Sequence, residues 1–331
     1  MRILPYIFII VLLSSCYTSK PSSENSSKSS TINVLDFGAD PTGNKDNTTV
    51  FNTALAKGKK VFIPEGEYRL DGMVTIKGPL HIEAGTTIIR KKKFSKKTTP
   101  MFWLNRTYAT MIGEDKTVRI ISENRSPKGI VKIGHENPLD NKLNINFCEV
   151  RNLFIRGSGR EILTGNTGVL LYNSQGNGNT KSSYFHTVSN LLIQQVNTGI
   201  HLLGISNANS INNIFFNRVG KSNDDYAIII EGAQENRIYD VFHHHSKDAN
   251  TILIKNGTHA NTDIKIEPVF NDIFGVISEP GGDKSRCLVA KSGKYNKVSI
   301  GCNCKAGFKV YKDYYKFRNS YNTNKGKGKK E

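Results

Sequence analysis

Histidine and basic residues gather in two short segments of this 331-residue chain. One segment has three consecutive histidines followed by a lysine, and an arginine and a lysine stand close together further upstream. An imidazole titrates near neutral pH and can accept a proton, whereas guanidinium and ammonium groups stabilise a developing negative charge. We therefore predict that a general base and its supporting cations come from His243, His244, His245, Arg218, Lys221 and Lys247.

Two other residue types near these segments offer further chemistry. Tyr226 and Tyr239 carry phenols that can protonate a leaving oxygen. Asp240 and Glu267 carry carboxylates, and a retaining glycosidase uses two carboxyl groups ~5 Å apart. Proton abstraction by an imidazole and hydrolysis by paired carboxylates are therefore two alternatives for the same region.

A repeat in the sequence brings these distant residues side by side. Asn190, Asn213 and Asn236 each begin a short apolar segment, at intervals of 23 residues. A period of this length is typical of stacked units that are each too small to bury their own apolar face. Alignment on these asparagines, and on Asp263, predicts one outward polar column of Gln194, Asn217, Asp240 and Glu267. The predicted substrate-binding residues are Gln194, Asn217, Glu267 and Arg237, and the additional catalytic candidates are Tyr239 and Asp240.

The elements that position these residues are expected to be strands. The repeats are short apolar segments between turns rich in Gly and Asn, with no helical pattern between them. A second apolar segment accompanies several repeats, over residues 198–203, 226–231 and 250–255 among others. This pattern predicts stacked β-coils.

The start of the folded region resembles a known family. The segments NVLDFGADPTGNKDNTTVF and KKVFIPEGEYRL, within about residues 32–72, closely resemble the N-terminal cap of the pectate-lyase-like superfamily of parallel β-helices. The resemblance implies that an amphipathic helix over residues 48–57 closes the end of the β-helix. The predicted fold class is therefore all-β, a right-handed single-stranded parallel β-helix over residues 32–320 with a short N-terminal capping helix.

The resemblance and the net charge of +18 together favour an anionic polysaccharide as partner. The superfamily includes lyases, glycosidases, phage tailspikes and lectin-like proteins. We expect a polysaccharide lyase that cleaves a uronate polymer by β-elimination. A glycoside hydrolase with paired carboxylates and a non-catalytic glycan-binding surface protein are the alternatives.

Several motifs of related enzymes are absent from this sequence. It lacks the Arg-x-Pro-x-x-Arg pattern and the calcium-binding aspartates of true pectate lyases, and the paired aspartates and Gly-His-Gly of polygalacturonases. Pectate is therefore not the expected polymer, no cofactor is predicted, and a Ca²⁺ site has no support. No nucleic-acid recognition motif is present, so nucleic acid is not an expected partner. The oligomeric state, monomer or trimer, stays open.

The N-terminus predicts export. Residues 1–15 have a positive start and an apolar run too short for a stable membrane anchor, and they end Leu-Ser-Ser before Cys16, which resembles a bacterial lipobox. We expect a signal peptide over residues 1–15, a lipidated Cys16, and a flexible tether over residues 16–31. The expected location is the outer membrane or cell surface, held by the lipid anchor, and residues 321–331 are expected to form a basic disordered tail.

Four cysteines remain after Cys16. They are Cys148, Cys287, Cys302 and Cys304. An exported protein can form disulfides, and Cys287 can pair with Cys302 or with Cys304, which are too close in sequence to bond each other without strain. No metal site is predicted, because no second Cys or His pair accompanies them.

Overall fold

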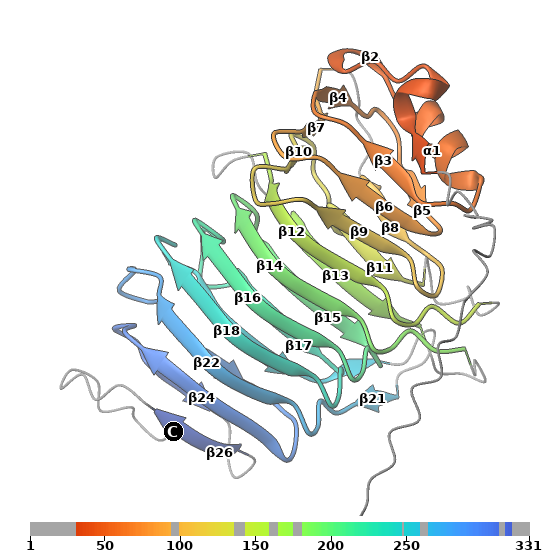
Figure 1. Ribbon diagram of the computed structural model, residues 1–331. Coiled ribbons are helices and arrows are strands. Elements are labelled where there is room, and N and C mark those ends of the chain that lie inside the picture. Colours follow the sequence, from red (N-terminus) through yellow and green to blue (C-terminus); the bar gives the residue numbers. More distant parts are fainter. Residues whose placement is uncertain are drawn as a thin grey trace, which may run out of the picture.

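The chain winds into stacked coils whose strands form two long parallel sheets (Figure 1). The computed structural model describes residues 31–93, 99–135, 143–158, 165–174, 181–246, 248–258 and 264–310, and the backbone of the strand 315–319. The described strands run from Ile32 to Asn319. The right-handed parallel β-helix predicted from the sequence is confirmed. Residues 1–30, the predicted leader and tether, lie outside the described part of the chain.

Sheet A contains the longest strands, and all its pairings are parallel. Its main path is β1 (Ile32–Asn33), β3 (Val61–Ile63), β6 (Pro79–Ile82), β9 (Thr110–Gly113), β12 (Glu149–Arg156), β14 (Thr187–Gln194), β16 (Ser210–Asn217), β18 (Arg237–His244), β22 (Asp272–Glu279), β24 (Asn296–Cys302) and β26 (Tyr315–Asn319). Beside this path lie β2 (Thr42–Asp46), β4 (Glu67–Arg69), β7 (Thr87–Arg90) and β10 (Arg119–Ser122).

Sheet B forms the other wall of the coils and is also parallel. Its strands, from the N-terminal end, are β5 (Val74–Ile76), β8 (Phe102–Leu104), β11 (Val131–Gly134), β13 (Thr167–Asn173), β15 (Thr198–Gly204), β17 (Tyr226–Glu231), β19 (Asn250–Lys255), β23 (Leu288–Ala290) and β25 (Phe308–Val310). One small antiparallel pair, β20 (Gly257–Thr258) and β21 (Lys265–Ile266), lies outside both sheets.

The N-terminal end of the stack carries a helix, as the sequence predicts. Helix α1 (Thr48–Ala56) follows β2, and a short 3₁₀ helix, η1 (Val34–Phe37), precedes it. Phe51, Ala54 and Leu55 of α1 are buried and belong to the same apolar core as the strands. The helix thus covers apolar surface beside the first coils (Figure 1), where an open sheet edge would otherwise invite pairing with another chain.

A single apolar core runs through the interior of the coils. Val188, Ile211 and Ile238 stand at paired positions in successive strands of sheet A, and all three are fully buried. Branched side chains suit the pleated surface of a strand, and burial of each contributes ~1.5–3 kcal/mol. The stacking of like side chains is therefore the main source of stability of the coils.

Each long strand in the middle of sheet A contains one residue whose backbone is in the left-handed conformation, and the strand bends there. Asn152, Asn190, Asn213 and Asp240 occupy this position in successive coils, with φ between 51° and 58°. Asn190 donates through Nδ2 to Asn152 at 2.8 Å, and Asn213 donates to Asn190 at 3.0 Å. Asn and Asp tolerate this conformation better than other side chains. The predicted alignment of Asn190 with Asn213 is confirmed.

The predicted alignment of Asn236 with Asn213 is wrong. The coil that follows Asn213 is longer than 23 residues, so Asp240, 27 residues on, stands beside Asn213. Asn236 belongs to a second, buried ladder formed with Asn209, Asn271 and Asn296. Its amide groups bond from coil to coil at 2.8–2.9 Å, which satisfies polar atoms that would be costly to bury alone.

Two of the cysteines form a disulfide in the last coils. Cys287 is bonded to Cys302, with 5.8 Å between the Cα atoms, whereas Cys148 and Cys304 are free and buried. The sulfur atoms of Cys287, Cys302 and Cys304 all lie within 4.8 Å of one another. Because two of these sulfurs are bonded to each other, the group is a disulfide with a neighbouring thiol and does not offer three thiolates to a metal.

The two asparagine ladders predict different costs of substitution. Asn236→Ala removes the acceptor of the Asn209 backbone N–H, at about 1–3 kcal/mol for an unsatisfied buried donor. It also removes one hydrogen bond each from Asn209 Nδ2, which keeps Ser206, and from Asn271 Oδ1, which keeps the backbone N–H of residue 236. We expect the free energy of unfolding to fall by about 2–4 kcal/mol. Asn213→Gly, in the exposed ladder, is the control, because glycine adopts the left-handed backbone of this position without strain, and it should cost less than about 1 kcal/mol. Urea unfolding measures both, and equal losses would contradict the assignment of the buried ladder.

Candidate functional site

Part of the predicted cluster does gather at one cleft. Asn217, Arg218, His244 and His245 line an open cleft of about 510 Å³ with Glu279, Pro280 and Gly281. Parallel pairing produces this arrangement, since Asn217 stands beside His244 and His244 beside Glu279. We call this site the predicted cleft.

The groups in the predicted cleft are loosely paired. His244 Nε2 lies 3.9 Å from Glu279 Oε2, and the rings of His244 and His245 are 3.5 Å apart between centroids. Arg218 is exposed and left-handed, with φ 57°. Gln194 occupies the same outward column as Asn217, one coil earlier. Sequence analysis missed Glu279, because the coil between it and His244 is 35 residues long.

His243 does not reach this cleft. The side chain is fully buried, with Nδ1 bonded to Thr251 Oγ1 at 2.8 Å and Nε2 to Ser246 Oγ at 2.6 Å. Alternation along β18 turns His243 inward when His244 points outward. Burial lowers the pKa of His243 to about 4. The prediction of His243 as a base in an outer groove is therefore wrong, and its role is to satisfy polar groups in the interior.

The other predicted residues lie apart from the cleft. Lys221 is exposed in the loop after β16, where its backbone N–H donates to Asp225 at 2.7 Å. Tyr239 faces outward from β18 and stacks on Phe274 at 5.2 Å, and Arg237 is exposed at the start of the same strand. Lys247 lies outside the described residues.

The predicted carboxylate pair does not form. Asp240 stands opposite Asn213 on one side, and Gly275 approaches it from the next coil. Glu267 lies elsewhere, in an ion pair with Lys294 at 3.0 Å. The predicted column of Gln194, Asn217, Asp240 and Glu267 therefore stops after its first two members, and the hydrolase geometry that depended on it is wrong.

A second group of charged residues, on the outer face of sheet B, was not predicted. His201 of β15, Glu231 of β17 and Lys255 of β19 stand on three successive strands, and we call them the His201 row. His201 Nε2 and Lys255 Nζ each lie 3.0 Å from Glu231 Oε2. All three side chains are part-buried, with 18–35% of their surface exposed.

The contact with Glu231 decides which ring nitrogen of His201 carries a hydrogen. Burial raises the pKa of Glu231, but the hydrogen bond from His201 and the ammonium group of Lys255 outweigh it and hold the pKa below its usual range. An ionised carboxylate only accepts hydrogen bonds, so His201 Nε2 must donate. In the neutral ring Nδ1 then carries the lone pair, and among the described residues none bonds to it.

Aromatic and basic side chains continue this face towards the N-terminal end. Lys132 of β11 lies over the rings of Trp103 and Tyr172, at 5.9 Å and 5.4 Å from their centroids. Trp103 donates through Nε1 to the carbonyl of Gly134 at 2.8 Å. Burial raises the pKa of Tyr172, so its phenol keeps its proton at neutral pH. A base, cations and a phenol thus share one wall of the β-helix.

A sequence signal for this face does exist. His201, Glu231 and Lys255 each follow branched or aliphatic residues near the ends of the expected segments 198–203, 226–231 and 250–255. In the sequence alone, a single polar residue at an outward position of an apolar strand looks the same as a residue at which the strand ends. The register of sheet B pairs Glu231 with Lys255 and pairs His201 with Ile229, two residues before Glu231 on the same face, and this brings the three together.

The fold and its polar outer walls define the class of this protein as a parallel β-helix. The model of the family described as rhamnogalacturonase A/epimerase, pectate lyase-like, matches residues 31–269, and the chain belongs to this family. No curated protein matches the sequence.

Several solved structures are similar to this chain at low sequence identity. ORF18 of Geobacillus virus E2 is 14% identical with a TM-score of 0.48, over 85% of this chain and 50% of that one, so the chain spans half the length of ORF18. PfbA, a surface adhesin of Streptococcus pneumoniae, is 12% identical with a TM-score of 0.48, over 84% and 88% of the two chains. The A-module of the mannuronan C-5 epimerase AlgE4 from Azotobacter vinelandii is 14% identical with a TM-score of 0.35, over 87% and 100%.

Within the described residues, no helix has the length and apolar character needed to cross a membrane.

The buried state of His243 predicts a dependence of stability on pH. In the folded protein His243 stays neutral down to about pH 4, whereas in the unfolded chain it binds a proton near 6.5. Between these values the unfolded state binds more protons, so stability falls as the pH falls. Thermal unfolding of His243→Gln should show a flatter dependence of Tm on pH in this window. The exposed His245→Gln is the control, and should keep the slope of the native sequence.

Proposed function

We propose that this protein acts on an acidic polysaccharide as a lyase, cleaving a uronate polymer by β-elimination. The observation that carries the proposal is the pair of 3.0 Å contacts that fix His201 and Lys255 on the carboxylate of Glu231. This arrangement offers an oriented base beside a cation on a wall accessible to a polymer. The high positive charge of the chain, +18, favours an anionic substrate.

The roles follow from the contacts. Nδ1 of His201 takes the proton from the carbon next to the uronate carboxyl group, and Glu231 stabilises the imidazolium that forms. Lys255 neutralises the substrate carboxylate, whose charge grows as the proton leaves. Tyr172, protonated at neutral pH, gives a proton to the departing glycosidic oxygen. His201 then releases its proton to solvent and Tyr172 regains one from solvent, so no net proton is consumed, and a carbon–carbon double bond replaces the broken carbon–oxygen bond.

Hydrolysis by two carboxyl groups has less support on this wall. The outward positions of β8, β11, β13, β15, β17, β19 and β23 that the structure describes carry one carboxylate, Glu231. Its partners are a histidine and a lysine rather than a second acid. A glycosidase of the usual kind places two carboxyl groups on either side of the bond.

An assay of a panel of uronate polymers tests the activity. A lyase produces unsaturated ends, which absorb in the ultraviolet, together with new reducing ends. A rise in both supports elimination, reducing ends alone mean hydrolysis, and binding without either means a glycan-binding protein. The last two outcomes would reject the proposal.

Single substitutions assign the reaction to one of the two surfaces. His201→Ala should reduce kcat by about 10²–10⁴-fold, the usual contribution of a general base, and Tyr172→Phe should reduce it as well. His244→Ala in the predicted cleft removes the same side chain from the other wall and is the matched control. Full activity in His201→Ala, with loss in His244→Ala, would transfer the site to the predicted cleft.

We also propose that the protein is an exported lipoprotein anchored through Cys16. The short apolar run and the small residues before Cys16 support this proposal. Metabolic labelling with a radioactive fatty acid should mark the native chain, and Cys16→Ala should lose the label and leave the membrane fraction. The control is Cys148→Ala, which removes a thiol buried in the folded part. Labelling of Cys16→Ala at the native level would reject the anchor.

A further inference from the structure

A second cleft lies on the outer face of sheet B, near the C-terminal end of the stack. It has a volume of about 410 Å³, and its floor includes Tyr226 and Val289. Four basic residues line it, and we call it the basic cleft: Lys284, Arg286, Lys291 and Lys309. They come from the loop before β23, the residue after β23, and β25. With Tyr226 of β17 and Asn250 of β19 also in the lining, four consecutive strands of sheet B contribute to this cleft.

Three of the four basic side chains of the cleft, those of Lys284, Arg286 and Lys291, have no carboxylate paired with them among the described residues. Asp283 is the one carboxylate in the lining, and Lys305 outside the lining binds it. Like charges gathered without counter-charges destabilise a fold, so this arrangement favours an anion as occupant.

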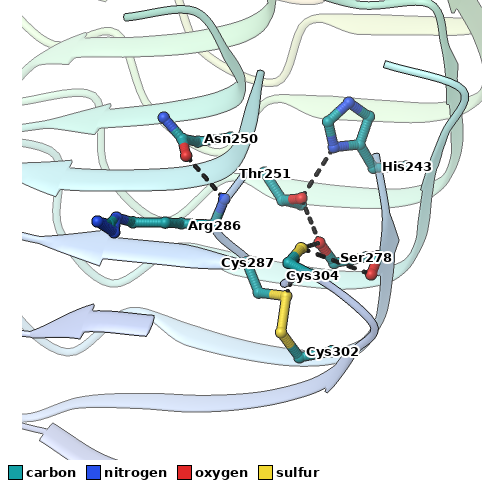
Figure 2. Close-up of a disulfide and its surroundings, with 8 residues drawn as sticks. All are labelled: His243, Asn250, Thr251, Ser278, Arg286, Cys287, Cys302 and Cys304. Atoms are coloured by element: carbon teal, nitrogen blue, oxygen red, sulfur yellow. Dashed lines mark hydrogen bonds between the residues drawn. A yellow bond between two sulfur atoms is a disulfide. The ribbon is translucent and has the colours of Figure 1, made fainter. Parts of the chain in front are cut away.

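The backbone that carries Arg286 is held firmly. Its N–H donates to Asn250 Oδ1 at 2.8 Å, and its carbonyl accepts from the N–H of Thr251 at 2.9 Å. The next residue, Cys287, is bonded to Cys302. Figure 2 shows the guanidinium group extending away from the disulfide and from the interior hydroxyl groups. Arg286 is thus presented at the surface by fixed neighbours, which reduces the entropy cost of binding.

The basic cleft and the His201 row lie on one continuous surface. Val289 stands three strands from His201 in the same outward column, with Ile229 and Leu253 between them. Adjacent strands are ~4.8 Å apart, so the separation is about 14 Å. Lys291 follows Ala290, the partner of Ile254, and so lies next to Lys255. The surface between the two sites is an apolar group of Tyr226, Ile229, Leu253 and Val289.

We infer that the basic cleft binds carboxylate groups of the same uronate polymer, several sugar units away from the bond cleaved at His201. The inference rests on the proposed function for the identity of the polymer. The apolar group between the sites offers a surface for the C–H faces of sugar rings, and the lysines and Arg286 bind the acidic substituents at the far end. Long substrates gain contacts that short ones cannot reach.

The experiment measures binding separately from turnover. In a His201→Ala background, calorimetry follows oligogalacturonates and oligomannuronates, as tetramers and octamers, with and without the triple change Lys284→Ala, Arg286→Ala and Lys309→Ala, which spares Lys291 because that lysine lies next to the His201 row. We expect the triple variant to bind octamers at least about tenfold more weakly, the loss of one charge-assisted hydrogen bond, and tetramers held by the His201 row to be little affected. The salt dependence of octamer binding should also decrease.

A second triple variant controls for net charge. Lys57→Ala, Lys116→Ala and Lys128→Ala remove three exposed lysines outside the lining of the cleft, and should leave octamer binding close to the native value. Equal weakening by both triple variants would mean a general charge effect and overturn the inference. Inorganic sulfate is the third ligand, and sulfate binding as tight as that of octamers would mean a site for small anions and would also overturn it.

The outcome separates this inference from the proposed function. If the native protein cleaves no uronate polymer but the cleft variant alone loses octamer binding, the cleft stands as a binding site and the lyase proposal fails. If the native protein is a lyase and the cleft variant binds octamers unchanged, the lyase stands and the cleft inference is overturned.

Discussion

The structure depends on the parallel, in-register pairing of each coil with the one before it. Pairing aligns the inward side chains into one apolar core, and it aligns the outward side chains into columns that cross strands far apart in sequence. Each coil alone is too small to exclude water from its apolar face. The same constraint that stabilises the fold therefore also creates every surface site on it.

The sequence predicted the fold and the alignment of β14 with β16, but not the alignment of β16 with β18. Asn190 and Asn213 form the expected pair because the coil between them contains no insertion. After Asn213 the loop that contains Lys221 lengthens the coil, so Asn236 falls in the buried ladder and Asp240 takes the outer position. A fixed period cannot detect such an insertion, since the Asn residues in both ladders look alike in sequence.

The errors in the predicted site have two physical causes. The prediction of His243 as a base was wrong because side chains alternate along a strand, so only one of two adjacent histidines faces outward. The outward one is His244. The His201 row was missed because its members are single polar residues in apolar strands, and prediction gave weight to clusters. Arg218, His244 and His245 do meet at a cleft, so the local cluster in the sequence did locate one polar surface of the fold. The description of the family names both a rhamnogalacturonase and an epimerase. Membership therefore does not decide the reaction, which has to be inferred from the side chains of the site.

The unequal lengths of the coils have an evolutionary consequence. Asn190, Asn213 and Asp240 occupy corresponding positions in three coils, yet they are separated by 23 and then by 27 residues. The strands that carry them stay in register. The extra residues are accommodated in turns outside the sheets. Each turn can therefore gain or lose residues without disturbing its neighbours, and a lineage can reshape the loops at the edge of the sheets one at a time while the paired strands remain intact.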